Sequence, residues 1–123
     1  MKPAKRFFLL TALSLCVAFS YSVALAKPKV TFVELGSTWC TPCKLMQPVM
    51  RSLEGNYGEQ LKVIFYNVST AKERKFAQEY RIKVIPTQVF LDENGKEFFR
   101  HQGFFPEAEI EKLLKQQGLI PKK

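Results

Sequence analysis

Two cysteines separated by two residues, Cys40 and Cys43, constrain the fold of this chain more than any other feature of its sequence. Before the pair, residues 30–35 form an apolar run that predicts a buried strand. After the pair, apolar side chains recur at helical spacing, and Pro42 suits the first turn of a helix. The sequence therefore predicts a helix that begins at the cysteines and is kinked by Pro48.

The cysteine pair has three candidate roles: a structural disulfide, half of a metal site, or a redox centre. A tetrahedral zinc site needs four ligands, and beside these cysteines the chain after residue 26 offers one histidine, His101. A Cys40–Cys43 disulfide closes so short a loop that it would remove little entropy from the unfolded chain. We therefore favour the redox role and expect no bound metal.

The position of each cysteine in the predicted helix separates their roles. Unpaired backbone N–H groups and the helix dipole favour negative charge at a helix start, so we expect Cys40 to be a thiolate at neutral pH. Cys43 lies one turn further along and should be buried and protonated. Cys40 would attack the disulfide of a partner, and Cys43 would then attack Cys40, releasing the partner and leaving a Cys40–Cys43 disulfide.

The first 26 residues have the three parts of a secretory signal peptide: a basic head, an apolar run over residues 7–20, and an Ala-Leu-Ala sequence that ends at Ala26. We expect cleavage after Ala26, loss of Cys16 with the leader, and export across the inner membrane to the periplasm. The alternative is an uncleaved leader that anchors the protein, because residues 7–26 are about long enough to span a membrane.

Residues 27–123 suffice for one compact domain, which we expect to be a monomer. Removing the three basic residues of the leader lowers the net charge from +8 to +5. Lys72, Arg74 and Lys75 form the densest basic cluster, but aromatic residues do not interleave with bases as a nucleic-acid surface requires. We therefore expect a solvated basic surface and no nucleic-acid partner.

Apolar periodicity and turn residues predict the other elements of the chain. They are strands over residues 61–68, 87–91 and 96–102, a hairpin turn at residues 92–95, and helices over residues 69–80 and 107–117. Ser69 or Thr70 should cap the first of these helices, and Gly118 should stop the second.

Two separate motifs in this order of elements resemble the thioredoxin family. The first is Phe-Val-Glu-Leu at residues 32–35, followed by Trp-Cys-Thr-Pro-Cys-Lys at residues 39–44 and by Pro48. The second is Val-Ile-Pro-Thr at residues 84–87, which is similar to the cis-proline loop that faces the cysteines in that family. Asn-Gly-Lys at residues 94–96 and Gly103 are similar to its final hairpin.

The resemblance implies an α/β thioredoxin fold, with a four-stranded mixed sheet flanked by helices. It also implies a cis Ile85–Pro86 bond, which would let an extended client segment pair with the backbone of Ile85 beside Cys40. The expected catalytic residues are Cys40, Cys43, Glu34 and Pro86, and the expected client-binding residues are Trp39, Pro42, Ile85, Gly103 and Phe104. For Phe104 and Phe105, packing in the core is the alternative.

The sequence departs from the family pattern at three places. Only residues 27–29 precede the first predicted strand, so the strand and helix that usually come before it are nearly absent. Thr41 replaces the usual glycine between the cysteines, which should shift the redox potential. Glu34 stands where the family has a buried aspartate, and Phe65 replaces the lysine usually found near that acid.

Glu34 is therefore expected to be a buried acid without a counter-charge, and burial should raise its pKa. A base whose pKa lies near the working pH transfers protons well, so we expect Glu34 to accept the proton of Cys43. The alternative is a buried acid retained for structural reasons. We interpret His101 as an exposed polar residue on an edge strand, outside the site.

These inferences favour an extracytoplasmic thiol-disulfide oxidoreductase that reduces disulfides of protein clients. The sequence has no nucleotide-binding fingerprint, so we expect no cofactor and assign the supply of electrons to another protein, a membrane-embedded donor. One alternative is a disulfide oxidase or isomerase, although the chain lacks the large helical insertion usual in oxidases of this fold. The other is a redox-inactive binding module with a thioredoxin fold.

Overall fold

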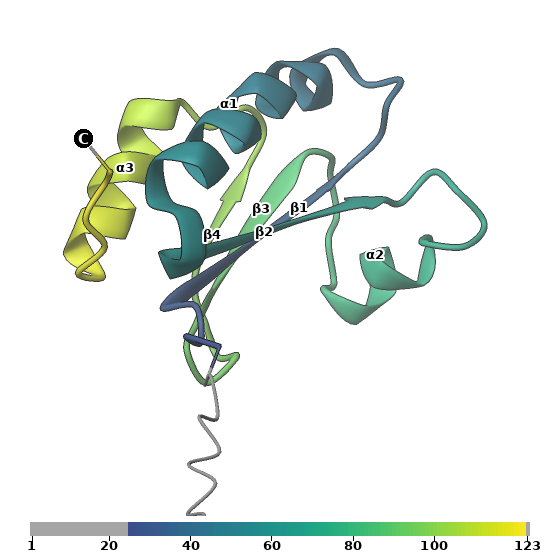
Figure 1. Ribbon diagram of the computed structural model, residues 1–123. Helices are drawn as coiled ribbons and strands as arrows, with labels where there is room; N and C mark the ends of the chain where they lie inside the picture. Colours follow the sequence, from purple (N-terminus) through teal and green to yellow (C-terminus); the bar gives the residue numbers. More distant parts are fainter. Residues whose placement is uncertain (1–24, 123) are drawn as a thin grey trace, which may run out of the picture.

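The computed structural model describes residues 25–122, which form a four-stranded sheet with helices on both faces (Figure 1). In chain order the elements are β1 (Val30–Gly36), α1 (Thr41–Tyr57), the 3-10 turn η1 (Gly58–Gln60), β2 (Leu61–Asn67), α2 (Lys75–Glu79), β3 (Thr87–Asp92), β4 (Glu97–Gln102) and α3 (Glu107–Gln116). Apart from its last two residues, the predicted signal peptide lies outside the described residues. Between residues 25 and 122, no helix is both long and apolar enough to cross a membrane.

The strands are arranged in the order β2-β1-β3-β4. β1 pairs with β2 in parallel and with β3 in antiparallel, and β3 and β4 form an antiparallel hairpin. This confirms the predicted mixed sheet. Helices α1 and α3 cover one face of the sheet and α2 lies against the other (Figure 1).

Alternation of side chains along β1 divides the core between these two faces. Val30 and Phe32 point toward α1 and α3, where Phe32 stacks on Phe90 of β3 with ring centroids 4.8 Å apart. Val33 and Leu35 point toward α2. By the same alternation, Glu34 and Gly36 lie on the α1 face of the sheet.

The structure corrects the prediction of a helix over residues 69–80, because α2 comprises only Lys75–Glu79. Thr70 forms the predicted cap, but the backbone N–H groups of Phe76 and Ala77 donate to carbonyls three residues back instead of four, so regular α-helix begins only at Lys75. The Thr70 hydroxyl donates to the carbonyl of Asn67 over 2.9 Å and accepts from the backbone N–H of Glu73. The Glu73 carboxylate in turn accepts from the backbone N–H of Asn67 over 2.7 Å.

The remaining element boundaries lie close to the predicted ones. Helix α1 contains Pro48 and continues to Tyr57, four residues beyond the last predicted apolar position, because Tyr57 is buried in the core. The predicted hairpin turn closes with a hydrogen bond from Gly95 N–H to the Asp92 carbonyl, and Gly95 has a φ of +78° that suits glycine.

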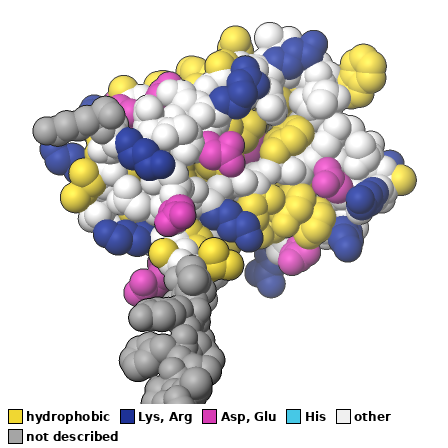
Figure 2. Space-filling view, in the orientation of Figure 1, with side chains coloured by type: hydrophobic (Ala, Val, Ile, Leu, Met, Phe, Trp, Pro, Cys, Tyr) yellow, Lys and Arg dark blue, Asp and Glu magenta, His cyan; other side chains and the backbone are white. Residues whose placement is uncertain are grey.

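Basic side chains are scattered over the face drawn in Figure 2, with acidic ones among them.

Candidate active site

The two cysteines form a disulfide at the start of α1, with their Cα atoms 5.1 Å apart. Cys40 is the N-cap of the helix, and its carbonyl accepts from the backbone N–H of Lys44 over 3.0 Å. The Cys40 side chain is half-buried, whereas Cys43 is 1% exposed. The predicted difference between an accessible sulfur and a buried one is therefore present in the structure.

Small residues at the end of β1 allow the helix start to approach the sheet. A Cβ atom added to Gly36 would lie 3.1 Å from the sulfur of Cys43, closer than packed side chains normally come. The Ser37 hydroxyl then accepts from the backbone N–H of Trp39 over 3.2 Å, which turns the chain toward Cys40. Gly36 thus permits Cys43 to sit directly over the end of the central strand.

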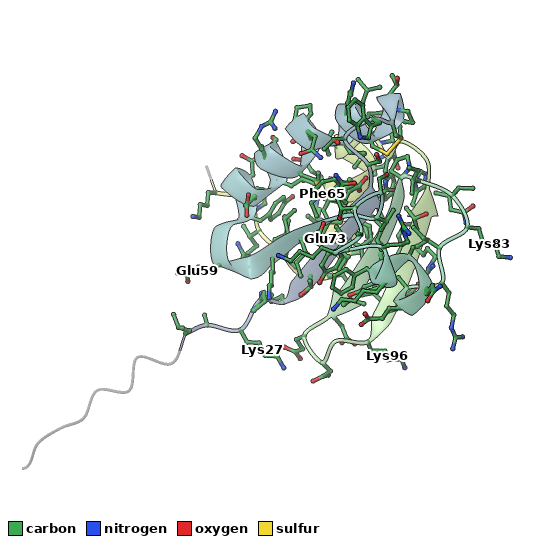
Figure 3. The ribbon with its side chains drawn as sticks, turned by 90° about the vertical axis from the view of Figure 1, so that its right-hand side faces the viewer. Lys27, Glu59, Phe65, Glu73, Lys83 and Lys96 are labelled. Atoms are coloured by element: carbon green, nitrogen blue, oxygen red, sulfur yellow. A yellow bond between two sulfur atoms is a disulfide. The ribbon has the colours of Figure 1, made fainter. Side chains whose placement is uncertain are left out.

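The Ile85–Pro86 peptide bond is cis, as the resemblance implied. Thr87 is the register partner of Leu35, which places Pro86 at the same end of the sheet as the cysteine loop. Gly103 lies there too, and its backbone N–H donates to the Pro86 carbonyl over 2.7 Å. Figure 3 shows the disulfide and the loop that carries Lys83 toward this end of the molecule. The pairing of β1 with β3 therefore brings the cysteine motif and the cis-proline motif to the same end of the sheet.

The residues predicted to bind clients differ in their exposure. Trp39 is 85% exposed, and Ile85 and Phe104 are also exposed. Phe105, by contrast, packs in the core, so the two neighbouring phenylalanines have different roles. Val84 is a further exposed apolar residue in the cis-proline loop, and it was not among the predicted client-binding residues. Binding of a client by this surface stays a prediction.

Glu34 lies fully buried in β1 beneath the cysteine loop, two residues before Gly36 on the same face of the strand. Burial raises the pKa of Glu34 to about 8, and a hydrogen bond from Gln88 opposes that rise. Phe65, labelled in Figure 3, is its register partner in β2 and places an apolar ring where a counter-charge would otherwise stand. The raised pKa agrees with the expectation from sequence.

Gln88, which was not among the predicted site residues, lies next to Glu34, and His101 lies next to Gln88. The side chain of Gln88 is fully buried in β3, and its amide nitrogen lies 3.4 Å from Oε1 of Glu34. The amide oxygen of Gln88 lies 2.9 Å from Nδ1 of His101. His101 is on the edge strand β4 as predicted, but it is half-buried and stacks on Phe105, which corrects the expectation that it is exposed.

One signal in the sequence could have revealed Gln88. It is a polar residue two positions before the core residue Phe90, and so it lies on the same, buried face of the strand. We predict that the cysteines bind no metal because the chain after residue 26 offers only His101 as a further histidine ligand. Over residues 25–122, the structure places no three His, Cys, Asp or Glu side chains close enough together to hold a metal ion.

Comparison with known proteins agrees with this geometry. The family model of the thioredoxin-like domain matches residues 18–118. The chain is 33% identical over 96 residues to thioredoxin of Pongo abelii, covering 78% of this chain and 84% of that protein. It is 35% identical over 78 residues to the thiol:disulfide interchange protein TxlA homolog of Synechocystis, covering 63% of this chain and 43% of that protein.

Solved structures show the same fold. The X-ray structure of Fasciola hepatica thioredoxin matches with a TM-score of 0.64 at 24% identity, covering 74% of this chain and 83% of that one. Several curated relatives are longer than this chain, which spans 47%, 43% and 31% of the length of three of them. The likeness therefore extends to only part of the length of these proteins.

Proposed function

This chain belongs to the thioredoxin-like family, and from that premise we propose that it is a thiol-disulfide oxidoreductase that reduces disulfides of protein clients outside the cytoplasm. The observation that carries the proposal is the Cys40–Cys43 disulfide, which lies at the start of α1 and at the same end of the sheet as the cis-proline loop. A relative named as a thiol:disulfide interchange protein supports the same enzyme class.

The first step begins with both cysteines reduced. The N-terminus of the 17-residue helix α1 favours the thiolate of Cys40, which attacks one sulfur of a client disulfide. A bond forms between Cys40 and that sulfur while the client's other sulfur leaves as a thiolate. The extended client segment would lie along Ile85 and the cis-proline, with the exposed Trp39 and Phe104 at its sides.

The second step releases the client. The Cys43 thiol gives its proton to the carboxylate of Glu34, directly or through a water, and the resulting thiolate attacks the sulfur of Cys40. The Cys40–Cys43 disulfide forms and the client leaves with its second sulfur reduced, so two electrons have passed from the enzyme to the client. The described structure corresponds to the product of this step, with the disulfide closed.

The disulfide must be reduced again before the next cycle. We assign this to another dithiol protein, embedded in the membrane, because export past the inner membrane separates the enzyme from cytoplasmic reductants. The basic head, apolar run and Ala-Leu-Ala sequence of residues 1–26 support that location. Intact mass of the exported protein tests it: a chain beginning at Lys27 supports a released protein, and a retained Met1 replaces it with a tethered one.

The direction of electron flow is tested by equilibrium titration of the purified protein against glutathione. A reduction potential near about −270 mV, which is that of thioredoxin, agrees with a reductant. A potential near about −120 mV would assign the protein to the oxidases instead. Failure to exchange with glutathione at all would leave only the binding-module alternative.

A further inference from the structure

Gln88 forms three polar contacts at the centre of the site, and the steps proposed above do not use it. Its amide nitrogen donates to the Gly103 carbonyl over 3.0 Å and lies 3.4 Å from Oε1 of Glu34. Its amide oxygen lies 2.9 Å from Nδ1 of His101. The contacts join β1, β3, β4 and the start of the segment that follows β4.

These partners determine which way the amide points. The Gly103 carbonyl can only accept a hydrogen bond, so it must face the amide NH₂ group. The amide oxygen must then face His101, whose Nδ1 carries the hydrogen of that bond. His101 is itself held by stacking on Phe105, with ring centroids 4.1 Å apart. The orientation therefore presents an N–H group, and not a carbonyl, to the carboxyl group of Glu34.

An N–H group directed at a carboxyl stabilises its ionised form. The second oxygen of Glu34, Oε2, is buried and has no hydrogen-bond partner among residues 25–122. Engagement of Oε1 by Gln88 thus leaves Oε2 as the atom available to take a proton. The nearest titratable groups of the neighbouring elements are Cys43 on α1, which lies over Gly36 two residues along β1, and His101 on β4, which lies beyond Gln88. On β2 the register partner of Glu34 is the apolar Phe65.

We propose that Gln88 is a positioning residue for proton transfer from Cys43, because its amide, oriented by Gly103 and His101, favours the carboxylate form of Glu34 and leaves Oε2 free to accept. The proposal rests on the function proposed above. It adds that the base of the resolving step is prepared by a hydrogen bond from β3, anchored at the Gly103 carbonyl beside the cis-proline.

The test compares Gln88→Met with Gln78→Met in the full domain. Gln78 is exposed on α2, on the opposite face of the sheet, so its replacement removes an amide without touching Glu34. The Glu34 carboxyl is titrated by carbon-13 NMR in the disulfide form, in which neither cysteine titrates. We expect its midpoint to rise by about one pH unit in Gln88→Met and to stay unchanged in Gln78→Met.

The kinetic readout follows from the same shift. At pH 7, a rise of about one unit leaves roughly tenfold less carboxylate, so release of a mixed disulfide should slow about tenfold while attack by Cys40 changes less than about twofold. If Gln88 has only a structural role, Gln88→Met should lower the stability but leave the Glu34 midpoint and the ratio of these two rates unchanged. That result would overturn the proposal.

A second measurement needs no variant at all. In the wild-type protein, the side-chain NH₂ resonances of Gln88 should shift with the same midpoint as the Glu34 carboxyl, whereas those of Gln78 should not. Gln88 resonances that stay constant through the titration would reject the contact. A wild-type chain that reduces no disulfide would reject the proposed function, whereas an active chain with an unmoved Gln88→Met midpoint rejects this inference alone.

Discussion

The two faces of the sheet differ in how completely they are covered. Toward α1 and α3, thirteen buried apolar residues form one cluster, and Glu34 and Gln88 lie fully buried on the same face. Toward α2, three buried residues (Val33, Leu35 and Val89) are covered by side chains that remain partly exposed. An acid keeps a strongly raised pKa only where water is excluded, so the densely covered face is the one that can hold the proton acceptor.

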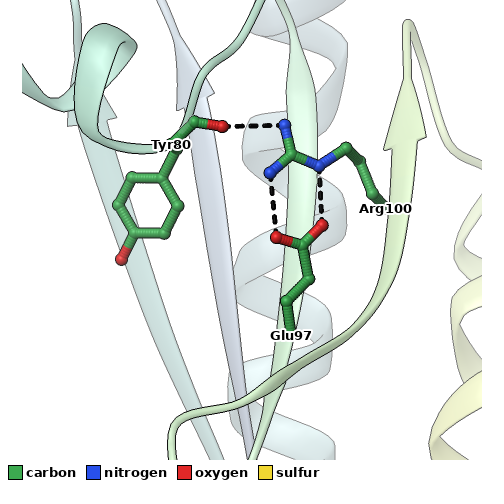
Figure 4. Close-up of polar contacts among 3 residues, drawn as sticks. All are labelled: Tyr80, Glu97 and Arg100. Atoms are coloured by element: carbon green, nitrogen blue, oxygen red, sulfur yellow. Dashed lines mark hydrogen bonds and ion pairs between the residues drawn. The ribbon is translucent and has the colours of Figure 1, made fainter.

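The thinly covered face is held by contacts that position the cis-proline loop. Tyr66 of β2 stacks on Phe76 of α2 with ring centroids 3.7 Å apart. Arg100 of β4 pairs with both carboxylate oxygens of Glu97 and donates through Nη1 to the Tyr80 carbonyl over 2.8 Å (Figure 4). The chain is thereby fixed to the sheet at Tyr80, where the segment that leads into the cis-proline loop begins. In the proposed function, one face therefore serves proton transfer and the other supports the loop expected to bind clients.

The largest effect is expected from Glu34→Gln on the α1 face, which keeps the shape of the side chain but removes the base. Attack by Cys40 on a test disulfide should change little, whereas release of the mixed disulfide should slow by ~10² to 10⁴. Stopped-flow kinetics separates the two steps. A release rate equal to that of the wild type across pH 6 to 8 would show that Glu34 is a structural acid.

The same residue should make stability depend on pH. Burial raises the pKa of Glu34 from 4.5 to about 8, so the folded protein binds a proton that the unfolded chain has lost. The free energy of unfolding should therefore fall by about 1.4 kcal/mol per pH unit as the pH rises through this window. Glu34→Gln should remove this part of the slope, as denaturant unfolding at several pH values would reveal. If the free energy of unfolding depends on pH in the same way in the wild type and in Glu34→Gln, the raised pKa of Glu34 is contradicted.

Phe76→Ala tests the other face. The substitution removes a partly buried ring and its stacking on Tyr66, which should lower the free energy of unfolding by about 2 kcal/mol. Because Phe76 lies on the face opposite Glu34, the carboxyl midpoint should not move. A shift of that midpoint together with the loss of stability would mean that the two faces are not independent.

The smallest effect is expected from Arg100→Met. It removes the hydrogen bond to the Tyr80 carbonyl and the ion pair with Glu97, whose pKa the Arg100 guanidinium holds below its usual range. We expect a loss of about 1 kcal/mol in stability and a few-fold weaker apparent binding of a peptide disulfide. Lys112→Met, which removes an exposed ion pair with Glu109, is the matched control and should change neither. If both variants lose the same stability and binding, the assigned role of Arg100 in supporting the cis-proline loop is contradicted.

Much of the fold could be predicted because its determinants are local in the sequence. Apolar periodicity located all four strands and two of the helices, and the Pro86 motif indicated the cis bond. The length of α2 could not be predicted in the same way. Thr70 caps a turn as predicted, but bonds between residues three apart take the place of α-helical ones before Lys75, and only the three-dimensional arrangement shows this.

The candidate site was predictable in part for a related reason. Glu34, Cys40 and Cys43 all lie on one continuous strand-loop-helix segment, so their relative placement follows from the sequence. The contact between Gln88 and His101 depends on the register of β3 against β4, and on which way an amide turns. Neither quantity is encoded in a local pattern.

The most direct test of the account is which cysteine forms the covalent bond to a client. In Cys43→Ala, the half-buried Cys40 can attack but the mixed disulfide cannot be resolved, so intact-mass spectrometry should detect an accumulated adduct with a peptide disulfide. Cys40→Ala leaves only the sulfur that is 1% exposed and should trap almost none. Accumulation in Cys40→Ala, with none in Cys43→Ala, would contradict the assignment of nucleophile and resolving cysteine on which the mechanism is built.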